Sequence, residues 1–402
     1  MFDLRRNAKK NILCGNKLYL QKKYRKALKF YIAALKHNRN NVTALINCAN
    51  CNFMLNKYSK TIYYLGLLKN KFNYENDLLA GQTYFETGNY TKAAECFENL
   101  IEQNKADPWV YNWLSQCCQK LSKLEDAIKY GFKAVKLSDG KDVAHQLNLG
   151  YLLYEVSLEQ NIDIVLKYSE KWLKKYPDNQ LVEYMAGAIV GKPTSEKSCF
   201  GGIREIFDAF APEFEKTLSD LSYQTPEIVA QILRKHKIRK TKVLDLGCGT
   251  GLCGKYLKEY ASFGGLIGVD ISANMLEEAE KKHIYSKLIN SEANMYLSSK
   301  NEAFGLICAA DVLTYFSELD KVFSAAYNAL KQGGYFIFSI TENSGDENFV
   351  QHRSGRFQHS ERYIVDLAAK NNFTVVEKQK STIRTENGVP VKGIVFLFYK
   401  NK

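Results

Sequence analysis

A single segment decides the fold of the C-terminal half: Lys242-Val243-Leu244-Asp245-Leu246-Gly247-Cys248-Gly249-Thr250-Gly251. A short apolar run ends in three alternating glycines, and residues 252–260 are then expected to form a helix. Glycine permits the positive φ angles of a tight turn and lets a ligand approach the backbone. The start of the helix adds N–H groups without intrahelical partners. The segment therefore predicts a strand, a ligand-binding turn and a helix.

The pattern continues outward from this turn as strands that alternate with helices. Such alternation indicates a parallel sheet covered on both faces. After the last expected helix come two strands, and Glu386-Asn387-Gly388 fits the turn of an antiparallel hairpin between them. The expected strands are 242–246, 266–270, 304–310, 335–340, 374–378 and 391–399, and the expected helices after the first are 273–282, 318–330 and 361–370.

The spacing of the glycines distinguishes between adenosine ligands. Asp270 ends the second strand, 21 residues after Gly249, where a carboxylate can accept hydrogen bonds from two ribose hydroxyls. A dinucleotide fingerprint, G-x-G-x-x-G, needs glycine where Leu252 stands. The motif Asp245-x-Gly247-x-Gly249-x-Gly251 instead resembles the first motif of class I S-adenosylmethionine-dependent methyltransferases. The resemblance implies a Rossmann-like domain with a seven-stranded mixed sheet that binds S-adenosyl-L-methionine.

The resemblance also implies the cofactor-binding residues. The glycine turn would hold the methionine moiety, Asp270 the ribose, and Asp245 would order the turn. Glu292, with Ala293, would read the adenine, the alternative being a solvated loop acid. Asp311 would contact the amino group of the cofactor or hold the loop after strand four. The full expected set is Asp245, Gly247, Gly249, Gly251, Asp270, Ile271, Glu292, Ala293 and Asp311, with no metal ligand.

The acceptor side is less defined, because methyl transfer mainly needs alignment and exclusion of water. A base is required only if the acceptor is protonated. We expect His359 to be catalytic; the alternative is a polar residue that orders the loop before the last helix. Phe210 is expected either to cover the cofactor or to pack in the core. The other acceptor-side candidates are Arg353, Arg356, Tyr315 and Tyr223. Tyr223, like Phe210, could instead cover the cofactor or pack in the core.

The resemblance extends beyond the glycine turn. The segments Phe207-Asp208-x-Phe210-Ala211-x-x-Phe214 and Gly355-Arg356-Phe357-x-His359-Ser360 are similar to motifs of bacterial methyltransferases that also carry tetratricopeptide repeats. The resemblance implies no substrate. Asp311-Val312-Leu313-Thr314 replaces the Asn-Pro-Pro-Tyr-like motif of common amino-methyltransferases.

The N-terminal half repeats itself. Tyr24-x-x-Ala27-x-x-x-Tyr31 recurs 34 residues later as Tyr58-x-x-Thr61-x-x-x-Leu65, and later units contain Ala93-x-x-x-Phe97 and Leu124-x-x-Ala127. A small residue recurs in the preceding helix of each unit: Gly15, Ala49, Gly81 and Ser115. Over residues 8–179 this pattern resembles the tetratricopeptide repeat, which implies a helical solenoid of stacked hairpins.

The expected organisation has three parts: a repeat array with a capping helix at 8–191, a linker at 192–202 and the methyltransferase domain at 203–402. We expect the array to bind a protein partner or a carrier protein and to bring its substrate to the transferase. The array could instead be a rigid brace. A further alternative is an adaptor whose cofactor-binding domain contributes little catalysis.

The net charge of +13 is concentrated at the N-terminus. Residues 1–72 hold 16 Lys and Arg and one acid, Asp3, so they carry +15, whereas the remaining residues hold 40 basic and 42 acidic side chains. This segment leaves open an RNA-directed or polyanion-directed transferase. The 10 cysteines are expected to be reduced, and Cys48-x-x-Cys51 lacks a second pair for zinc. No apolar run reaches the roughly 18 residues of a spanning helix, so we expect a cytoplasmic protein without membrane association.

Overall fold

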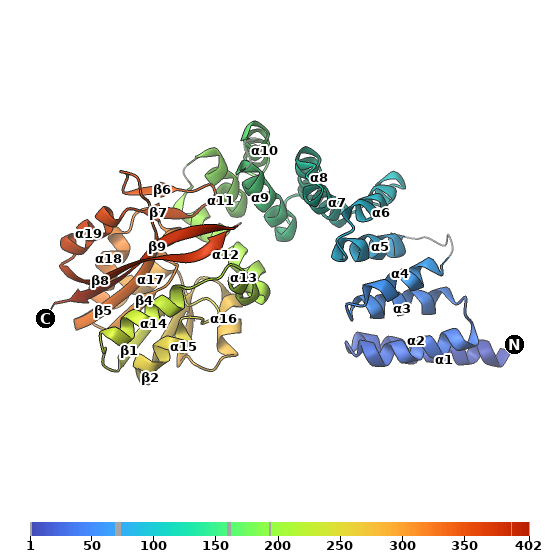
Figure 1. Ribbon diagram of the computed structural model, residues 1–402, viewed down its shortest axis with the longest axis horizontal. Helices are drawn as coiled ribbons and strands as arrows, with labels where there is room; N and C mark the ends of the chain where they lie inside the picture. Colours follow the sequence, from blue (N-terminus) through green and yellow to red (C-terminus); the bar gives the residue numbers. More distant parts are fainter. Residues whose placement is uncertain (1, 69–73, 159–161, 193, 387, 402) are drawn as a thin grey trace. The chain divides into compact units, whose positions relative to one another are not determined.

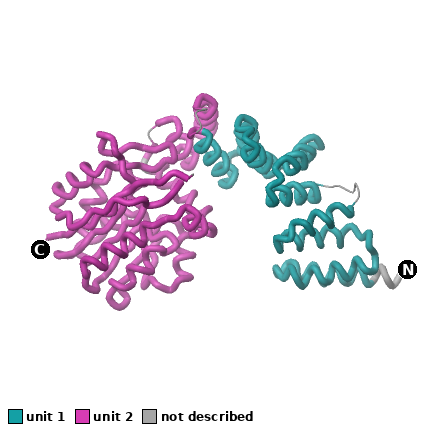
Figure 2. The backbone as a smooth tube through the Cα atoms, in the orientation of Figure 1, with its two compact units in different colours: residues 1–156 teal, residues 157–402 magenta. Residues whose placement is uncertain are grey.

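The computed structural model describes residues 2–68, 74–158, 162–192, 194–386 and 388–401. The chain divides into two compact units, residues 1–156 and 157–402, which Figure 2 colours separately. Each unit is described by itself below. No described helix is long and apolar enough to cross a membrane.

The first unit consists of helices that pair in sequence (Figure 1). Small residues permit the close pairing that the sequence predicted: a Cβ added at Gly15 would lie 2.5 Å from the Tyr31 ring, and one at Gly81 would lie 2.6 Å from the Phe97 ring. The tetratricopeptide identity of these hairpins stays a prediction. The helices are α1 (Phe2–Leu20), α2 (Tyr24–His37), α3 (Val42–Phe53), α4 (Tyr58–Gly66), α5 (Tyr74–Glu86), α6 (Tyr90–Glu102), α7 (Pro108–Lys120), α8 (Leu124–Leu137) and α9 (Val143–Ser157).

The second unit begins with helices α10 (Ile162–Lys175), α11 (Gln180–Val190) and α12 (Glu196–Phe210). Helix α11 is closely joined to α12. Its Glu183 accepts hydrogen bonds from Ser195 N at 3.0 Å and from Ser198 Oγ at 2.5 Å, and a Cβ at Gly202 would lie 2.6 Å from Tyr184 Cβ. Part of the expected linker, 192–202, is therefore the first turns of α12.

The sheet of the second unit has the order β3-β2-β1-β4-β5-β9-β8. All neighbouring strands are parallel except that β9 is antiparallel to both β5 and β8, so the expected seven-stranded mixed sheet is confirmed. The strands are β1 (Thr241–Leu246), β2 (Ala261–Asp270), β3 (Lys287–Asn290), β4 (Phe304–Ala309), β5 (Leu330–Thr341), β8 (Phe373–Glu386) and β9 (Val389–Lys400).

Helices cover both faces of this sheet (Figure 1). One core contains Tyr296, Phe323 and Ile364 from three helices, and the other contains Val229 and Leu257 from two. The first three helices are α17 (Ala293–Ser298), α18 (Asp320–Ala329) and α19 (Glu361–Lys370), and the other two are α14 (Thr225–Lys235) and α15 (Gly254–Leu257); α13 (Phe214–Asp220) and α16 (Ala273–Glu280) complete the set. The doubly covered sheet brings the carboxyl ends of β1, β2 and β4 to one edge.

Several elements of the second unit differ from the sequence prediction: β3 is not among the expected strands, and β2 and β5 begin earlier than expected. Strands β8 and β9 are longer than expected, because their pairing continues from Phe373 opposite Lys400 to Glu386 opposite Val389. The expected turn residue Asn387 lies outside the described residues. A separate hairpin of β6 (Phe349–Gln351) and β7 (Phe357–His359) was not predicted.

We expect Gly81→Ala to destabilise the first unit by about 1–3 kcal/mol, because the new methyl group would overlap the Phe97 ring and force α5 from α6. Gly66→Ala is the matched control, since no atom lies within 4 Å of its added Cβ. Thermal unfolding followed by circular dichroism should show a lower midpoint only for the first variant. Equal midpoints would contradict close packing at this position.

Candidate cofactor and acceptor site

The turn after β1 is built from three glycines with positive φ. Gly247, Gly249 and Gly251 have φ values of 64°, 51° and 90°. A Cβ at Gly247 would lie 2.1 Å from a methyl group of Val312, so this glycine packs against the segment after β4. At Gly249 the added Cβ would meet only the Phe214 ring, at 3.6 Å. The backbone at Gly249 thus leaves room for a ligand to approach, as the predicted cofactor requires.

Asp270 joins this turn to the end of β2. Its Oδ2 accepts a hydrogen bond from Gly249 N at 2.8 Å, and its Oδ1 accepts one from Ser272 N at 2.9 Å. Burial raises the pKa of Asp270 to about 6, against the effect of these N–H donors. A backbone hydrogen bond from Ile271 also acts on this carboxylate. Because a carboxylate has about four acceptor positions, it retains the capacity to accept a ribose hydroxyl. Its predicted role therefore fits the geometry.

Asp245 lies beneath the turn and is 1% exposed. Its Oδ2 accepts a hydrogen bond from the Tyr285 hydroxyl at 2.6 Å, and burial raises the pKa of Asp245 to about 7. The Tyr285 ring closes on the turn from the other side, because a Cβ at Gly251 would lie 3.0 Å from it. Asp245 thus acts on the turn through Tyr285, which fits its predicted ordering role.

The residues expected around the adenine follow β2 and β3. Glu292 caps α17: its two carboxylate oxygens accept from Asn294 N and Met295 N, both at 2.6 Å. Ala293 is the first residue of that helix. The carbonyl of Ile271 accepts from Asn290 Nδ2 at 2.9 Å. The contacts of Glu292 and Ala293 with an adenine, and of Ile271 with the cofactor, stay predictions.

Asp311, just after β4, has a left-handed backbone with φ of 59°, which is uncommon for a residue other than glycine. Its N–H donates to Ser339 Oγ at 2.7 Å, and its carboxylate accepts from Arg384 Nη1 at 3.1 and 3.3 Å. The Arg384 side chain is 4% exposed and also donates from Nε to Glu386 at 2.6 Å. Buried charges require such pairing. Asp311 is thereby held at the carboxyl end of β4.

Sequence reasoning missed Arg384 and Glu386. They lie on the extension of β8 beyond its expected end, and residues two apart on a strand share a face. The oppositely charged pair Arg384-x-Glu386, placed just before a hairpin turn, was the available signal.

Glu386 also pairs with Arg356, which precedes β7. Burial would raise the pKa of Glu386, but the guanidinium groups of Arg356 and Arg384 lower it to about 2. The Arg356 side chain is 33% exposed. Arg353, by contrast, donates to the carbonyl of Ser157 at 2.6 Å, outside this charged cluster.

Aromatic rings connect the glycine turn to Arg356. The Phe214 ring lies beside Gly249. Between ring centroids, Phe214 lies 6.1 Å from Phe207, and Phe207 lies 5.6 Å from Tyr315. Phe210 packs on Phe214 at 6.0 Å. Tyr315 is the neighbour of Arg356. We name Phe214, Phe207 and Tyr315 the aromatic wall.

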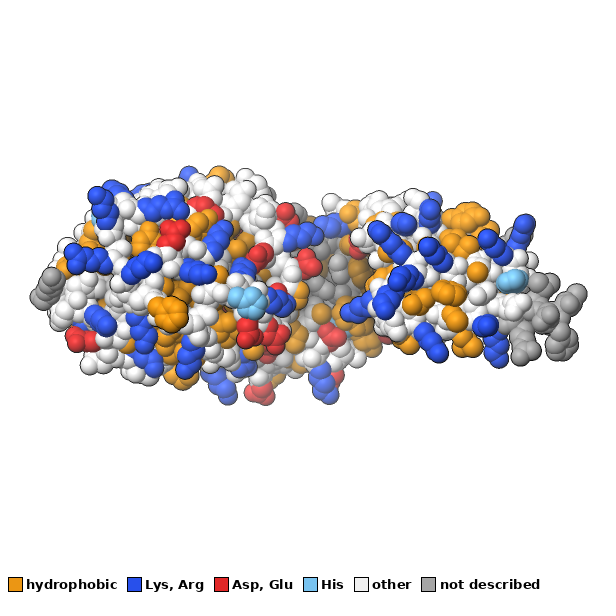
Figure 3. Space-filling model, turned by 90° about the horizontal axis from the view of Figure 1, so that it is seen from below, with side chains coloured by type: hydrophobic (Ala, Val, Ile, Leu, Met, Phe, Trp, Pro, Cys, Tyr) orange, Lys and Arg blue, Asp and Glu red, His pale blue; other side chains and the backbone are white. Residues whose placement is uncertain are grey.

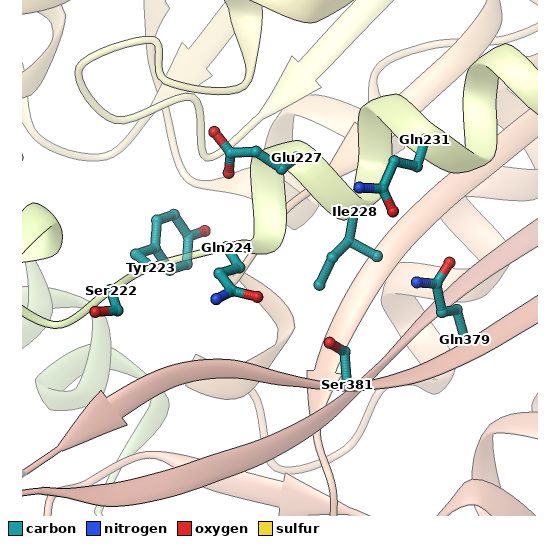
Figure 4. Close-up of a pocket in the computed structure, with 8 residues that line it drawn as sticks. All are labelled: Ser222, Tyr223, Gln224, Glu227, Ile228, Gln231, Gln379 and Ser381. Atoms are coloured by element: carbon teal, nitrogen blue, oxygen red, sulfur yellow. The ribbon is translucent and has the colours of Figure 1, made fainter.

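An open cavity of about 470 Å³ lies between the start of α14 and β8 (Figure 4). Tyr223, one of the predicted lid residues, is among its lining residues. Burial raises the pKa of the Tyr223 hydroxyl well above its usual value, and the nearby Asp311 carboxylate adds to the effect. The other lining residues are Ser222, Gln224, Glu227, Ile228, Gln231, Gln379 and Ser381.

His359 is completely buried. Its Nε2 donates to the carbonyl of Ser317 at 3.1 Å, and its ring stacks on Tyr363 at 6.1 Å. Among the described residues its Nδ1 has no hydrogen-bond partner. Burial lowers the pKa of His359 to about 4. This geometry favours the alternative expectation, in which His359 orders the loop before α19, over the catalytic one.

We expect His359 to reduce stability in acid. Its pKa is near 6.5 when unfolded and about 4 when folded, so the stability of the neutral form is complete above pH 6.5 and is lost as the pH falls toward 4. The full loss is about 3 kcal/mol. His359→Gln should therefore flatten the fall in unfolding midpoint between pH 7 and pH 5 in the full chain. An unchanged acid slope, together with abolished methyl transfer, would instead support the catalytic role.

The chain is similar in sequence to a protein family and to curated proteins. A model of the methyltransferase domain family matches residues 244–338. Trans-aconitate 2-methyltransferase of Rhodopseudomonas palustris is 28% identical over 163 residues, which is 40% of this chain and 62% of that protein. Malonyl-[acyl-carrier protein] O-methyltransferase of Legionella pneumophila is 26% identical over 140 residues, or 34% of this chain and 49% of that protein.

A solved structure, magnesium protoporphyrin IX methyltransferase of Synechocystis PCC 6803 with bound SAM, is 16% identical with a TM-score of 0.40 and covers 50% of this chain and 97% of its own. The chain thus spans 62% or less of the two curated relatives. The matched segment contains the second half of β1, the glycine turn, Asp270, β4 and most of β5. The C-terminal half of the chain therefore contains a class I S-adenosylmethionine-dependent methyltransferase domain.

Proposed function

We propose that this protein transfers the methyl group of S-adenosylmethionine to a nucleophilic acceptor. The glycine turn carries the proposal, because an accessible Gly249 backbone lies beside an Asp270 carboxylate with free acceptor positions. When bound, the cofactor supplies an activated methyl group. The protein's own part is to bind it, to orient the acceptor and to exclude water.

The protein has residues suited to each of these tasks. Gly249 and Asp270 would bind the methionine and ribose ends of the cofactor, as the sequence resemblance implies. The aromatic wall offers apolar rings beside the turn, where they can keep water from the reacting atoms. Asp311 and its partner Arg384 end the site on the β4 side.

The proposal extends to the helical array, which we propose recruits a protein or a carrier-bound substrate. A small metabolite reaches a pocket by diffusion, whereas a tethered macromolecule gains an effective concentration of up to roughly millimolar. The name of the Legionella relative includes an acyl-carrier protein, which supports a carrier-bound acceptor.

The positive charge of the first two hairpins indicates that this partner is acidic. No acidic residue stands between Asp3 and Glu75. On the face drawn in Figure 3, basic side chains gather among exposed apolar ones toward the N-terminal end of the chain. Such a mixed basic and apolar surface suits an acidic protein. The exposed basic residues described there are Lys9, Lys10, Lys17, Lys22, Lys23, Arg25, Lys26, Lys29, Lys36, Arg39, Lys57 and Lys60.

We expect Asp270→Asn to weaken cofactor binding by about 10- to 100-fold, because hydrogen bonds to a charged carboxylate are worth about 1.5–3 kcal/mol. The amide would also accept through one atom only, and Gly249 N and Ser272 N would compete for it. Titration calorimetry with S-adenosylhomocysteine measures the affinity without turnover. Asp366→Asn, an exposed position on α19, is the matched control. Equal affinity of both variants would remove Asp270 from the site.

Removing residues 1–156 tests recruitment, since contacts divide the chain at this point and keep α10 and α11 with the transferase. We expect KM for the macromolecular acceptor to rise at least tenfold, while affinity for S-adenosylhomocysteine changes less than twofold. An unchanged KM would leave the array as a brace. Competition by RNA, and not by acidic protein fractions, would favour the polyanion-directed alternative. Cofactor binding without transfer to any acceptor would favour the adaptor alternative.

A further inference from the structure

We infer that the methyl acceptor carries a carboxylate, that Arg356 binds this group, and that one of its oxygens takes the methyl group. The inference rests on the proposed methyl transfer and names the substrate class for the same site. Three observations carry it: the position of Arg356, its remaining hydrogen-bond donors and the chemistry of the surrounding side chains.

Two series of contacts end at Arg356. One begins at the glycine turn, and the other begins at the carboxyl end of β4. The aromatic wall leads from Gly249 to Tyr315, which neighbours Arg356. The second series leads from Asp311 after β4 through Arg384 and Glu386 to the same guanidinium. Thr314 also donates to the carbonyl of Phe357, next to Arg356, and so fixes β7 beside the end of β4. Ligands of such sheets bind outside the carboxyl ends of the strands.

Arg356 differs from Arg384 in its capacity to bind a ligand. Arg384 is 4% exposed, and its contacts with Asp311 and Glu386 hold it inside the protein. Arg356 is 33% exposed, gives Nη1 to Glu386 and also donates to the Tyr315 hydroxyl. A guanidinium has five N–H donors in a planar fork that matches a carboxylate. Arg356 can therefore hold Glu386 and still present donors to an anionic group.

The titratable neighbours of Arg356 include Tyr184, Tyr315, Glu386 and Asp311, of which the last three are poor bases. The hydroxyls of Tyr223 and Tyr315 keep their protons, because burial raises the pKa of both. Glu386 and Asp311 are paired with arginines. The pKa of Glu386 is about 2, so it has little tendency to take a proton at neutral pH.

The two nearby histidines do not supply the missing base. His359 is buried and donates to Ser317. In His352, Nδ1 accepts from Ser354 N at 3.3 Å and lies 3.0 Å from Ser354 Oγ, and burial lowers the pKa of the ring, which makes it a weaker base. An amine or alcohol acceptor would need a base to take its proton. A carboxylate is already ionised at neutral pH and needs none.

The step balances without a proton. One carboxylate oxygen donates an electron pair to the methyl carbon, and an O–C bond forms as the S–C bond breaks. The bonding pair stays on sulfur, so the positive sulfonium becomes the neutral thioether of S-adenosylhomocysteine. The negative carboxylate becomes a neutral methyl ester. Arg356 orients the second oxygen, and ester formation removes the charge that it binds, which favours product release.

The test uses the full chain, S-[methyl-³H]adenosylmethionine and lysate of the cells that make this protein, because the acceptor is unidentified. Mild alkali hydrolyses methyl esters and releases tritiated methanol, whereas N-methyl, C-methyl and S-methyl products keep their label. We expect most of the transferred label to become volatile. Arg356→Gln should lower the initial rate at least tenfold and Arg356→Lys less, with affinity for S-adenosylhomocysteine within twofold of the wild type. Arg362→Gln, at an exposed position on α19, should transfer at the wild-type rate.

Alkali-stable label would overturn the inference and leave the methyl transfer intact. Transfer by Arg356→Gln at the wild-type rate would overturn the role of Arg356 in binding the acceptor and would also leave the methyl transfer intact. Absence of label in every fraction, with S-adenosylhomocysteine still bound, would instead refute the proposed methyl transfer and the inference with it. Arg356→Lys guards against misfolding, because it keeps the charge that pairs with Glu386.

Discussion

The hydrogen bond from Gly249 N to the Asp270 carboxylate, 2.8 Å long, is the interaction on which the site depends. It fixes the turn after β1 against the end of β2, and Ser272 N holds the second oxygen. Burial raises the pKa of this carboxylate, so its charge is maintained at a cost that the N–H donors offset. Phe214 then packs beside Gly249, and through it the aromatic wall is placed beside the glycine turn.

A second set of charges builds the opposite side of the site. The long strand β8 brings Arg384 and Glu386 to the end of β4, where they hold Asp311 and pair with Arg356. Four charged side chains are thus satisfied mutually, as burial demands. Because three of the four are tied on the strand side, the exposed part of Arg356 is the element of this cluster that can meet an acceptor.

Local patterns predicted the parts of the fold that depend on neighbouring residues. Sequence reasoning found the glycine turn, Asp270 and helix α19 at 361–370, because the signals for each of these features lie within its own short segment. The acceptor side was only partly predictable, because Arg356 and Arg384 both pair with Glu386. Glu386 is two residues from Arg384 but 30 residues from Arg356 in the sequence. His359 was selected from a motif, but its burial depends on the β6–β7 hairpin, whose three-residue strands give no clear periodic signal.

Hydrogen–deuterium exchange of the full chain with and without S-adenosylhomocysteine can locate the cofactor site. We expect slower exchange of the amides at 247–252 and 270–276, because the ligand would cover the Gly249 turn and the residues after β2. The amides of residues 8–156 should exchange at unchanged rates. Protection confined to other segments, or no protection at a saturating ligand concentration, would contradict a cofactor site built on Gly249 and Asp270.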